Sequence, residues 1–511
     1  MVGISEKIGH TTTQYILLIL IMGGVLFFSL RDFLVEPAYW FDEAITIEIA
    51  RNFYLFGELD ILTAPDTFSG VPYIAGTNGY PLTLPLAAFF AVAGYGLAEA
   101  RIFMLFWLIT CLFAVYFVTK KIFGVVPAFA ALLLVATFAS FYGNGLTATG
   151  EIPGFLFFLF ALFLAAHKKD YMLAGVCAGL AMAAKPGVYL FLAHAVVLFI
   201  LLVEQGERVK SFLRFGAGLI PPIIIWILLA FPLSMDTFFS TAVYAVNPLD
   251  IPVLRNLFDA PEITNLNTDL IIPSSESALA NIQGNILLLL TSSTWVYFLL
   301  MSAAVFFAYL VSKKQQTEQR RFMQISLIYG VLALAYFLRG PGWIRYLFGF
   351  QILFLILLFP SLTVLKEKIK IYSDVRRHYG FDYLLYIGII LLVAAQTYHL
   401  LYLSNVPRSQ AALRLVSYTE TQARENPALT LGLVNVPEVA AFSDPARIYH
   451  MIWLQRTMPP FGKQFFTEGT RPDLVITDGK NFLLGEAGEK ILQGEYQETT
   501  RFGRYRIYER L

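Results

Sequence analysis

Long charge-free stretches follow one another along most of the chain, and eleven of them are candidate membrane-spanning helices. A spanning helix needs roughly 20 mostly apolar residues, within a range of about 17–25. The candidate windows are 11–30, 102–119, 122–150, 152–166, 171–184, 186–203, 215–235, 277–312, 322–338, 346–365 and 383–407. Two windows are short, so their helices are expected to tilt little or to depend on flanking side chains that snorkel. The pattern predicts an all-α polytopic membrane protein.

A twelfth apolar segment, 81–96, contains two prolines and two glycines and could either cross the membrane or lie at its surface. The distribution of Lys and Arg distinguishes these topologies, because cytoplasmic loops carry an excess of both residues. With eleven spans the excess falls on the side that holds the N-terminus, whereas a twelfth span moves it to the other side. We therefore predict about eleven spans, a half-buried juxtamembrane segment at 81–96, a cytoplasmic N-terminus and an external C-terminus.

Loops and tail divide the chain into two predicted domains. Residues 1–407 form the transmembrane domain, whose long external loops are about 31–101 and 236–286. Charged residues are about twice as frequent in 408–511 as before it, which indicates a soluble domain. Within this tail SQAALRLVSYTETQAREN favours a helix, LTLGLV and DLVITDG favour strands, and YQETTRFGRYRIYER favours a closing hairpin. The tail is expected to be a small external α/β domain.

Composition supports this assignment and excludes several classes of protein. Of the 511 residues 57% are apolar and only 14% are charged, whereas soluble proteins have about 45–50% apolar and ~25% charged residues. These values exclude a soluble enzyme, a disordered chain and a coiled coil. A net charge of +1 provides no field that would attract nucleic acid. Cys111 and Cys177 both lie in apolar runs, so neither a disulfide scaffold nor a cysteine-based metal site is expected.

Acidic residues at the outer ends of helices are the first candidates for chemistry, because ionisable groups at membrane depth are costly. In AYWFDEAITIEIARNF the apolar spacing predicts a helix over 42–55, which Asp42 and Glu43 open. Helix N-termini favour anions, so the helix dipole alone can account for Asp42, with no functional role. The dipole does not require a second carboxylate at Glu43. Glu151 separates two apolar windows in GNGLTATGEIPGFLFF, where it either interacts with the helix dipole or has a function.

Basic residues occur at the same predicted outer ends. Lys185 follows an apolar helix in GLAMAAKPG and either snorkels to the interface or stabilises a phosphate. FLRGPGWIRYLFGF places Arg339, Arg345 and Tyr346 in a short outer turn, where Trp343 suits an interfacial anchor. Two outer arginines run against the positive-inside bias, which favours a functional role for them. The six histidines form no metal-spaced set.

These features, taken in order, resemble a known superfamily. An Asp-Glu pair in the first outer loop, a Pro-rich segment and Ala-Arg opening a helix are followed by a Lys-Lys turn. A second outer acidic residue, a Lys-Pro helix end and a late Arg-Tyr pair complete the series, over about residues 13–350. The series resembles the GT-C superfamily of polytopic glycosyltransferases, in the branch of aminoarabinose lipid A transferases and protein O-mannosyltransferases. DEAITIEIAR is similar to the aminoarabinose transferases' pattern D-E-x-x-x-x-E-I-x-R.

The resemblance implies a GT-C fold and a reaction. A sugar would pass from a polyprenyl-phosphate donor to a lipid, glycan or protein acceptor on the extracytoplasmic face, with inversion. Asp42 is implied as the catalytic carboxylate, with Glu43 as its neighbour and Glu151 at the second acidic position. Lys185 and Arg345 fall where family members contact the donor phosphate, and the same outer turn contributes two further candidates for that contact, Arg339 and Tyr346.

Cofactor and alternatives stay open at this point. TNGYPLTLPL lacks the acidic residue with which some relatives bind a metal, so the cofactor is unknown and a divalent metal ion is one alternative. Besides the donor and acceptor, membrane lipids are expected partners. A lipid or solute transporter is the second class considered, and a non-catalytic scaffold is the third. Against a transporter, mid-helix ionisable residues are nearly absent and no inverted repeat is visible.

Overall fold

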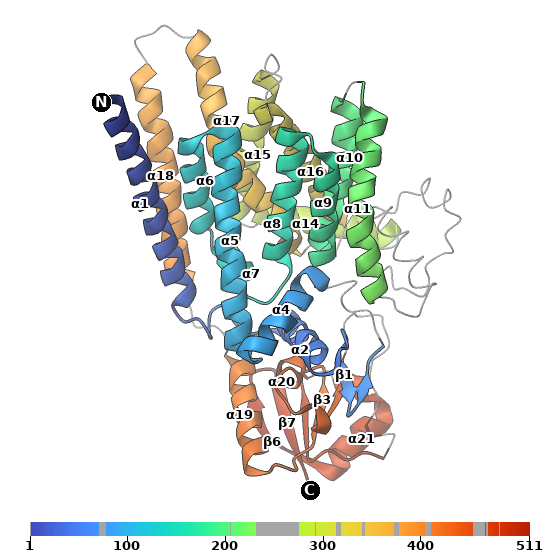
Figure 1. The fold of residues 1–511 in the computed structure, drawn as a ribbon. Helices are drawn as coiled ribbons and strands as arrows, with labels where there is room; N and C mark the ends of the chain where they lie inside the picture. The colour runs from blue at the N-terminus through green and yellow to red at the C-terminus, as the bar shows by residue number, and fades with distance from the viewer. Residues whose placement is uncertain are drawn as a thin grey trace.

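The computed structural model describes residues 2–70, 78–204, 206–230, 275–291, 293–312, 318–339, 343–372, 378–403, 410–452, 465–466, 469–479 and 481–511. Long helices run side by side in a bundle, and the C-terminal region lies at one end of it (Figure 1). The N-terminus lies at the other end of the bundle (Figure 1). Most of the predicted loop 236–286, as far as residue 274, falls outside the described residues.

Each predicted membrane window contains a helix or a pair of helices. Among the residues that the structure describes, eight helices are long and apolar enough to cross a membrane, and a pair bent by 66° makes up a ninth candidate. The helices of the predicted windows are α1 (Val2–Leu30), α5 (Leu97–Phe123), the bent pair α6 (Val125–Ala136) and α7 (Ala139–Gly145), α8 (Glu151–Phe163), α9 (Tyr171–Ala184), α10 (Pro186–Val203), α11 (Arg208–Ala230), α14 (Ser275–Thr291), α15 (Ser293–Val311), α16 (Glu318–Arg339), α17 (Phe348–Tyr372) and α18 (His378–Leu403). Among them α9, α14 and α15 are shorter apolar helices.

Window 277–312, taken from the sequence as one span, holds two helices, α14 and α15. The window is longer than one membrane crossing requires. At its centre the sequence reads Thr-Ser-Ser-Thr, and such hydroxyl side chains compete with the helix for backbone hydrogen bonds. Both reasons favour a break there, which the charge-free criterion alone does not detect.

Two short helices separate the bundle from the tail. They are α2 (Phe41–Phe56) and α4 (Tyr80–Ala93), which pack against each other at the end of the bundle (Figure 1). Pro81 lies in the first turn of α4, where its missing N–H costs nothing. With 14 residues, α4 is one of the shorter apolar helices, as α9 is. The juxtamembrane position of 81–96 stays a prediction.

The tail forms an α/β unit around a five-stranded sheet with the order β4-β3-β5-β7-β6. Strand β3 pairs in parallel with β4 and β5, and β7 pairs antiparallel with β5 and β6. The elements are α19 (Ala411–Glu425), β3 (Leu431–Val434), α20 (Pro437–Ala440), β4 (Ile448–Met451), β5 (Leu474–Thr477), α21 (Gly485–Glu495), β6 (Tyr496–Phe502) and β7 (Tyr505–Arg510). The predicted helix, two strands and hairpin are all present, whereas β4 and α21 were not foreseen.

One apolar core joins the tail to the juxtamembrane helices. Ile47 of α2, Leu86 of α4 and Met104 of α5 are buried in the same cluster as Leu415 and Val439 of the tail. A two-stranded hairpin, β1 (Leu62–Ala64) with β2 (Thr67–Phe68), follows α2, and β1 packs on β4. Since burial of apolar surface is the main stabilising force in folding, α2 is held between the bundle and the tail.

Candidate active site

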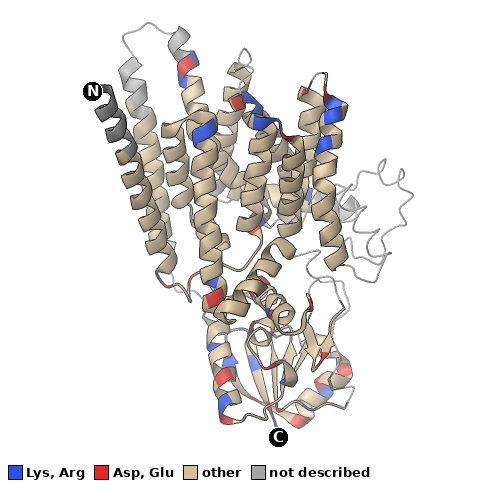
Figure 2. Cartoon of the chain, viewed as in Figure 1, with Lys and Arg blue, Asp and Glu red and all other residues tan. Residues whose placement is uncertain are grey.

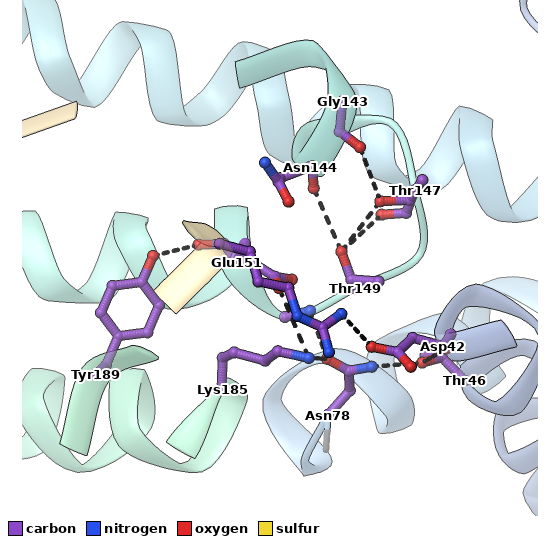
Figure 3. Close-up of polar contacts among 12 residues, drawn as sticks. Asp42, Thr46, Asn78, Gly143, Asn144, Thr147, Thr149, Glu151, Lys185 and Tyr189 are labelled. Atoms are coloured by element: carbon purple, nitrogen blue, oxygen red, sulfur yellow. Dashed lines mark hydrogen bonds and ion pairs between the residues drawn. The ribbon is translucent and has the colours of Figure 1, made fainter. Parts of the chain in front are cut away.

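Four segments that are distant in the sequence bring polar side chains together where the bundle meets α2. Asp42 lies in the first turn of α2 and Glu151 begins α8. Lys185 stands between α9 and α10, and Arg345 belongs to a 3-10 turn, Ile344–Leu347, before α17. Lys185 precedes a proline, which disfavours helical backbone, and its φ of −151° is extended. The chain therefore breaks at Lys185 and presents this side chain to the cluster (Figure 3).

Asp42 forms an ion pair with Arg345 at the accessible side of this cluster. The side chains are 17% and 22% exposed, respectively, so a ligand can reach both. The guanidinium carbon of Arg345 lies 5.1 Å from the ring centre of Trp40 and 5.0 Å from that of Trp343. Cation–π attraction of this kind favours a guanidinium close to aromatic rings. The arginine is thus held by aromatic rings as well as by its carboxylate partner.

Lys185 and Glu151 form the deeper pair. Their side chains are 5% and 1% exposed, and the Lys185 Nζ lies 3.7 Å from Oε1 of Glu151 (Figure 3). Within the described residues neither carboxylate oxygen of Glu151 has a hydrogen-bond partner. A buried carboxylate without hydrogen bonds is costly unless a charge compensates it. Lys185 supplies that charge and is itself retained in the site by Glu151.

Asn78 connects the two pairs and was missed when only ionisable residues were considered. Its Oδ1 accepts hydrogen bonds from Lys185 Nζ at 2.9 Å and from the Gly150 N–H at 2.8 Å (Figure 3). Its Nδ2 donates to Thr46 Oγ1 at 2.7 Å, and the Thr46 hydroxyl donates to the Asp42 carbonyl at 2.9 Å. The sequence did contain a signal for Asn78, because it is a polar residue in a charge-free stretch, just before the Pro-rich segment.

Glu43 points away from the cluster, although it is adjacent to Asp42 in the sequence. Its Oε1 and Oε2 accept hydrogen bonds from Arg101 Nε at 3.0 Å and from Nη2 at 2.8 Å, and both side chains are fully buried. Arg101 also donates to the Phe33 carbonyl at 3.0 Å. Successive residues of a helix point in directions about 100° apart, as its 3.6 residues per turn require. Glu43 therefore joins α2 to α5, while Asp42 faces Arg345.

Two candidates remain, of which Tyr346 lies beside Arg345, with the guanidinium carbon 6.0 Å from the ring centre. The Tyr346 ring stacks on Tyr336 with 5.9 Å between ring centres and lies beside Gly187, where a Cβ would come within 3.1 Å of the ring. Arg339 is the last residue of α16. In the described part of the chain, no three His, Cys, Asp or Glu side chains gather as metal ligands would. The divalent ion considered from the sequence therefore stays a prediction.

A second buried polar group lies at the far end of α2, against the tail. The Arg51 guanidinium donates to the carbonyls of Ala440 at 2.8 Å and Ser443 at 3.1 Å. Glu48 Oε1 accepts from the Leu62 N–H at 3.0 Å, and burial raises the pKa of Glu48 to about 7. His450 of β4 is also buried, and burial, with Arg51 nearby, lowers its pKa to about 3. Burial in the interface between α2 and the tail thus favours the neutral forms of Glu48 and His450.

Known proteins share this architecture. The family model described as dolichyl-phosphate-mannose-protein mannosyltransferase matches residues 82–235. ArnT from Cupriavidus metallidurans bound to undecaprenyl phosphate is 12% identical with a TM-score of 0.59, over 96% of this chain and 97% of that one. AglB from Archaeoglobus fulgidus, an oligosaccharyltransferase in complex with an inhibitory peptide and a dolichol-phosphate, is 13% identical with a TM-score of 0.52, over 95% and 73%. Among curated proteins no sequence match is found.

At these identities the structural likeness establishes the fold, and it extends over nearly the whole of this chain. The family model adds an independent match through the segment from α4 to α11, which contains Glu151 and Lys185. The helical bundle and the apolar spans identify an integral membrane protein. The chain therefore has the fold of ArnT and AglB, and residues 82–235 match the mannosyltransferase family model, which confirms the resemblance seen in its sequence.

Proposed function

We propose that this protein transfers a sugar from a polyprenyl-phosphate donor to a hydroxyl group of a lipid, glycan or protein acceptor. The observation that carries the proposal is the pairing of a reachable carboxylate, Asp42, with a cation, Arg345, beside the buried Lys185–Glu151 pair. A transferase of this kind needs a base for the acceptor and fixed positive charge for the leaving phosphate. This cluster contains both.

The reaction is a single displacement at the anomeric carbon. The acceptor oxygen forms a bond to this carbon while the bond to the phosphate oxygen breaks, and its electron pair leaves with the lipid phosphate. Asp42 accepts the proton of the acceptor hydroxyl. Arg345 and Lys185 stabilise the negative charge of the departing phosphate. Attack opposite to the leaving group inverts the configuration of the sugar.

The donor class follows from the membrane and from the relatives. ArnT is described with undecaprenyl phosphate and AglB with a dolichol-phosphate, so both solved relatives bind a polyprenyl lipid. A lipid phosphate lies at headgroup depth, and the cluster lies where the ends of α8 and α9 meet the first turn of α2. Lys and Arg gather at the ends of the bundle that point away from the tail (Figure 2). The positive-inside rule then supports a cytoplasmic N-terminus and an extracytoplasmic tail and site.

The test uses the full-length protein in lipid with a panel of radiolabelled polyprenyl-phosphate sugars. We expect the wild type to consume one donor, and Asp42→Asn to bind this donor but lose about 10²–10⁴-fold in turnover, the usual contribution of a general base. Asp66→Asn is the matched control, because Asp66 lies in the β1–β2 turn with a positive φ that Asn also adopts. Parallel assays with a chelator test the requirement for a metal. Full activity of Asp42→Asn, or no donor consumed by the wild type, would contradict the proposal.

A further inference from the structure

The inference concerns the partner of Arg345 and rests on the proposed function. The cluster contains two carboxylates, Asp42 and Glu151, and two cations, Arg345 and Lys185, so its formal charges cancel. A lipid phosphate is an additional anion. When it accepts a charge-assisted hydrogen bond from one of these cations, it competes with the carboxylate that already neutralises that cation.

Burial indicates which cation changes partner. Lys185 is almost fully buried, and its ammonium is engaged by both Glu151 and Asn78. Arg345 and Asp42 are both partly exposed. Arg345 is therefore the cation that an incoming phosphate reaches first, and Asp42 is the carboxylate with which the phosphate competes.

The surroundings of Arg345 suit an exchange of partners. Trp40 and Trp343 contact the guanidinium through their rings, an attraction that does not use its N–H groups. A guanidinium has five N–H donors in a planar fork that matches phosphate as well as carboxylate. The rings can therefore hold the arginine in place while its N–H donors pass from Asp42 to the phosphate.

We propose that the donor phosphate displaces Asp42 from Arg345, and that this exchange frees the base. Without donor, the Asp42 carboxylate is paired and cannot accept a proton efficiently from an acceptor hydroxyl. With donor bound, Arg345 holds the phosphate and the Asp42 carboxylate is available to the acceptor. Productive binding is then ordered, with the donor before the acceptor, and Asp42 acts as an internal competitor of the lipid phosphate.

Competition of this kind predicts that a variant inactive in transfer binds lipid phosphate more tightly. The measurement is equilibrium binding of radiolabelled undecaprenyl phosphate to the protein in lipid nanodiscs. Asp42→Asn removes the competing charge at almost unchanged shape, and we expect at least about fivefold tighter binding, the lower end of typical coupling between two ligands of one site. Asp66→Asn serves as the control and should bind as the wild type does.

A double-mutant cycle assigns the effect to Arg345. Arg345→Gln should weaken binding, and adding Asp42→Asn to it should give no further gain. Arg345→Lys keeps the charge without the planar fork and provides a second background if Arg345→Gln folds poorly. In the Arg345→Lys background, Asp42→Asn should tighten binding of lipid phosphate less than it does in the wild type. Equal or weaker binding by Asp42→Asn would overturn the exchange while leaving the proposed reaction intact. Absence of binding by both the wild type and Asp42→Asn would contradict the proposed function itself.

Discussion

At the scale of single residues, the chemistry depends on which side chains are charged and which are neutral. Asp42, Glu151, Lys185 and Arg345 could be selected from the sequence because ionisable residues at helix ends are rare in so apolar a chain. Their partners could not be selected. Glu43 pairs with Arg101, which is 58 positions away in the sequence. Local sequence patterns cannot reveal a partner at such a separation.

Asn78 is the neutral member of the site, and we expect its neutrality to matter. In Asn78→Asp the oxygen that accepts from Lys185 and Gly150 can be kept, but a negative charge is added beside the ammonium. Lys185 then has a second carboxylate partner, so its ammonium attracts a phosphate less strongly. We expect KM for the donor to rise on the order of tenfold, a change of about 1.4 kcal/mol, with a smaller change in kcat.

Steady-state kinetics with varied donor concentration measures this effect. Thr46→Val is the control, because it removes the hydroxyl that Asn78 contacts without adding charge. If the donor KM of Asn78→Asp equals that of the wild type, the Asn78 amide has only a structural role and the prediction is wrong.

At the scale of elements, apolar windows and helix signals sufficed for most helices, short apolar runs sufficed for β3 and β5, and alternation sufficed for the closing hairpin. Strand β4 (Ile448–Met451) was missed because its sequence, IYHM, contains a polar histidine and lacks the run of branched apolar residues that marks LGLV and LVIT. The contact between α9 and α11 could not be foreseen either. Gly175 of α9 and Gly218 of α11 let these backbones approach, since a Cβ on Gly218 would lie 1.9 Å from the Met172 carbonyl oxygen. Close approach through small residues is typical of membrane helices.

Two glycines of α11 provide a matched test of this packing. Gly218→Ala places a methyl group against backbone that cannot rotate away, so we expect a lower melting temperature than in the wild type. Gly216→Ala, two residues away, meets no atom within 4 Å and should be neutral or stabilising by up to about 1 kcal/mol, the difference in helix propensity. Thermal unfolding in lipid, followed by intrinsic fluorescence, compares them. Equal melting temperatures would contradict the role of the close contact.

At the scale of the whole molecule, the tail and the membrane domain are joined through α2. Tyr39 donates a hydrogen bond to the Glu438 carbonyl at 3.2 Å across 399 positions of sequence. Composition sufficed to predict a more polar tail, and local patterns predicted its helix and strands. The contact of the tail with α2 could not be predicted. Local sequence patterns indicate that the residues of the shared apolar core are buried, but they do not indicate against which element.

This interface predicts a characteristic dependence of stability on pH. Glu48 has its pKa raised from 4.5 to about 7, so the folded protein holds this proton more tightly and stability falls as pH rises between these values. His450 has its pKa lowered from 6.5 to about 3, so stability falls as pH drops below about 6.5. Between about pH 4.5 and 6.5 the two contributions oppose each other and largely cancel.

Glu48→Gln removes one of the two contributions. We expect this variant to be more stable than the wild type at pH 8, by up to about 3 kcal/mol, since no buried carboxyl has to ionise. Its stability should also decline steadily below pH 6.5, where the wild-type profile is flat. Melting temperatures across pH 4.5–8.5 measure both effects, with Glu58→Gln as the exposed control. A profile of Glu48→Gln that matches the wild type would contradict the assignment.

The anchoring of Arg51 on the carbonyls of Ala440 and Ser443 has a consequence for how the protein is made. The carbonyl of Ala440 lies 389 positions after Arg51, so it is synthesised long after α2 has left the ribosome. A nascent chain can therefore insert its helices in the membrane before α2 has this support. On the proposed function, in which Asp42 of α2 is the base, we expect deletion of the tail to abolish transfer while membrane insertion is kept.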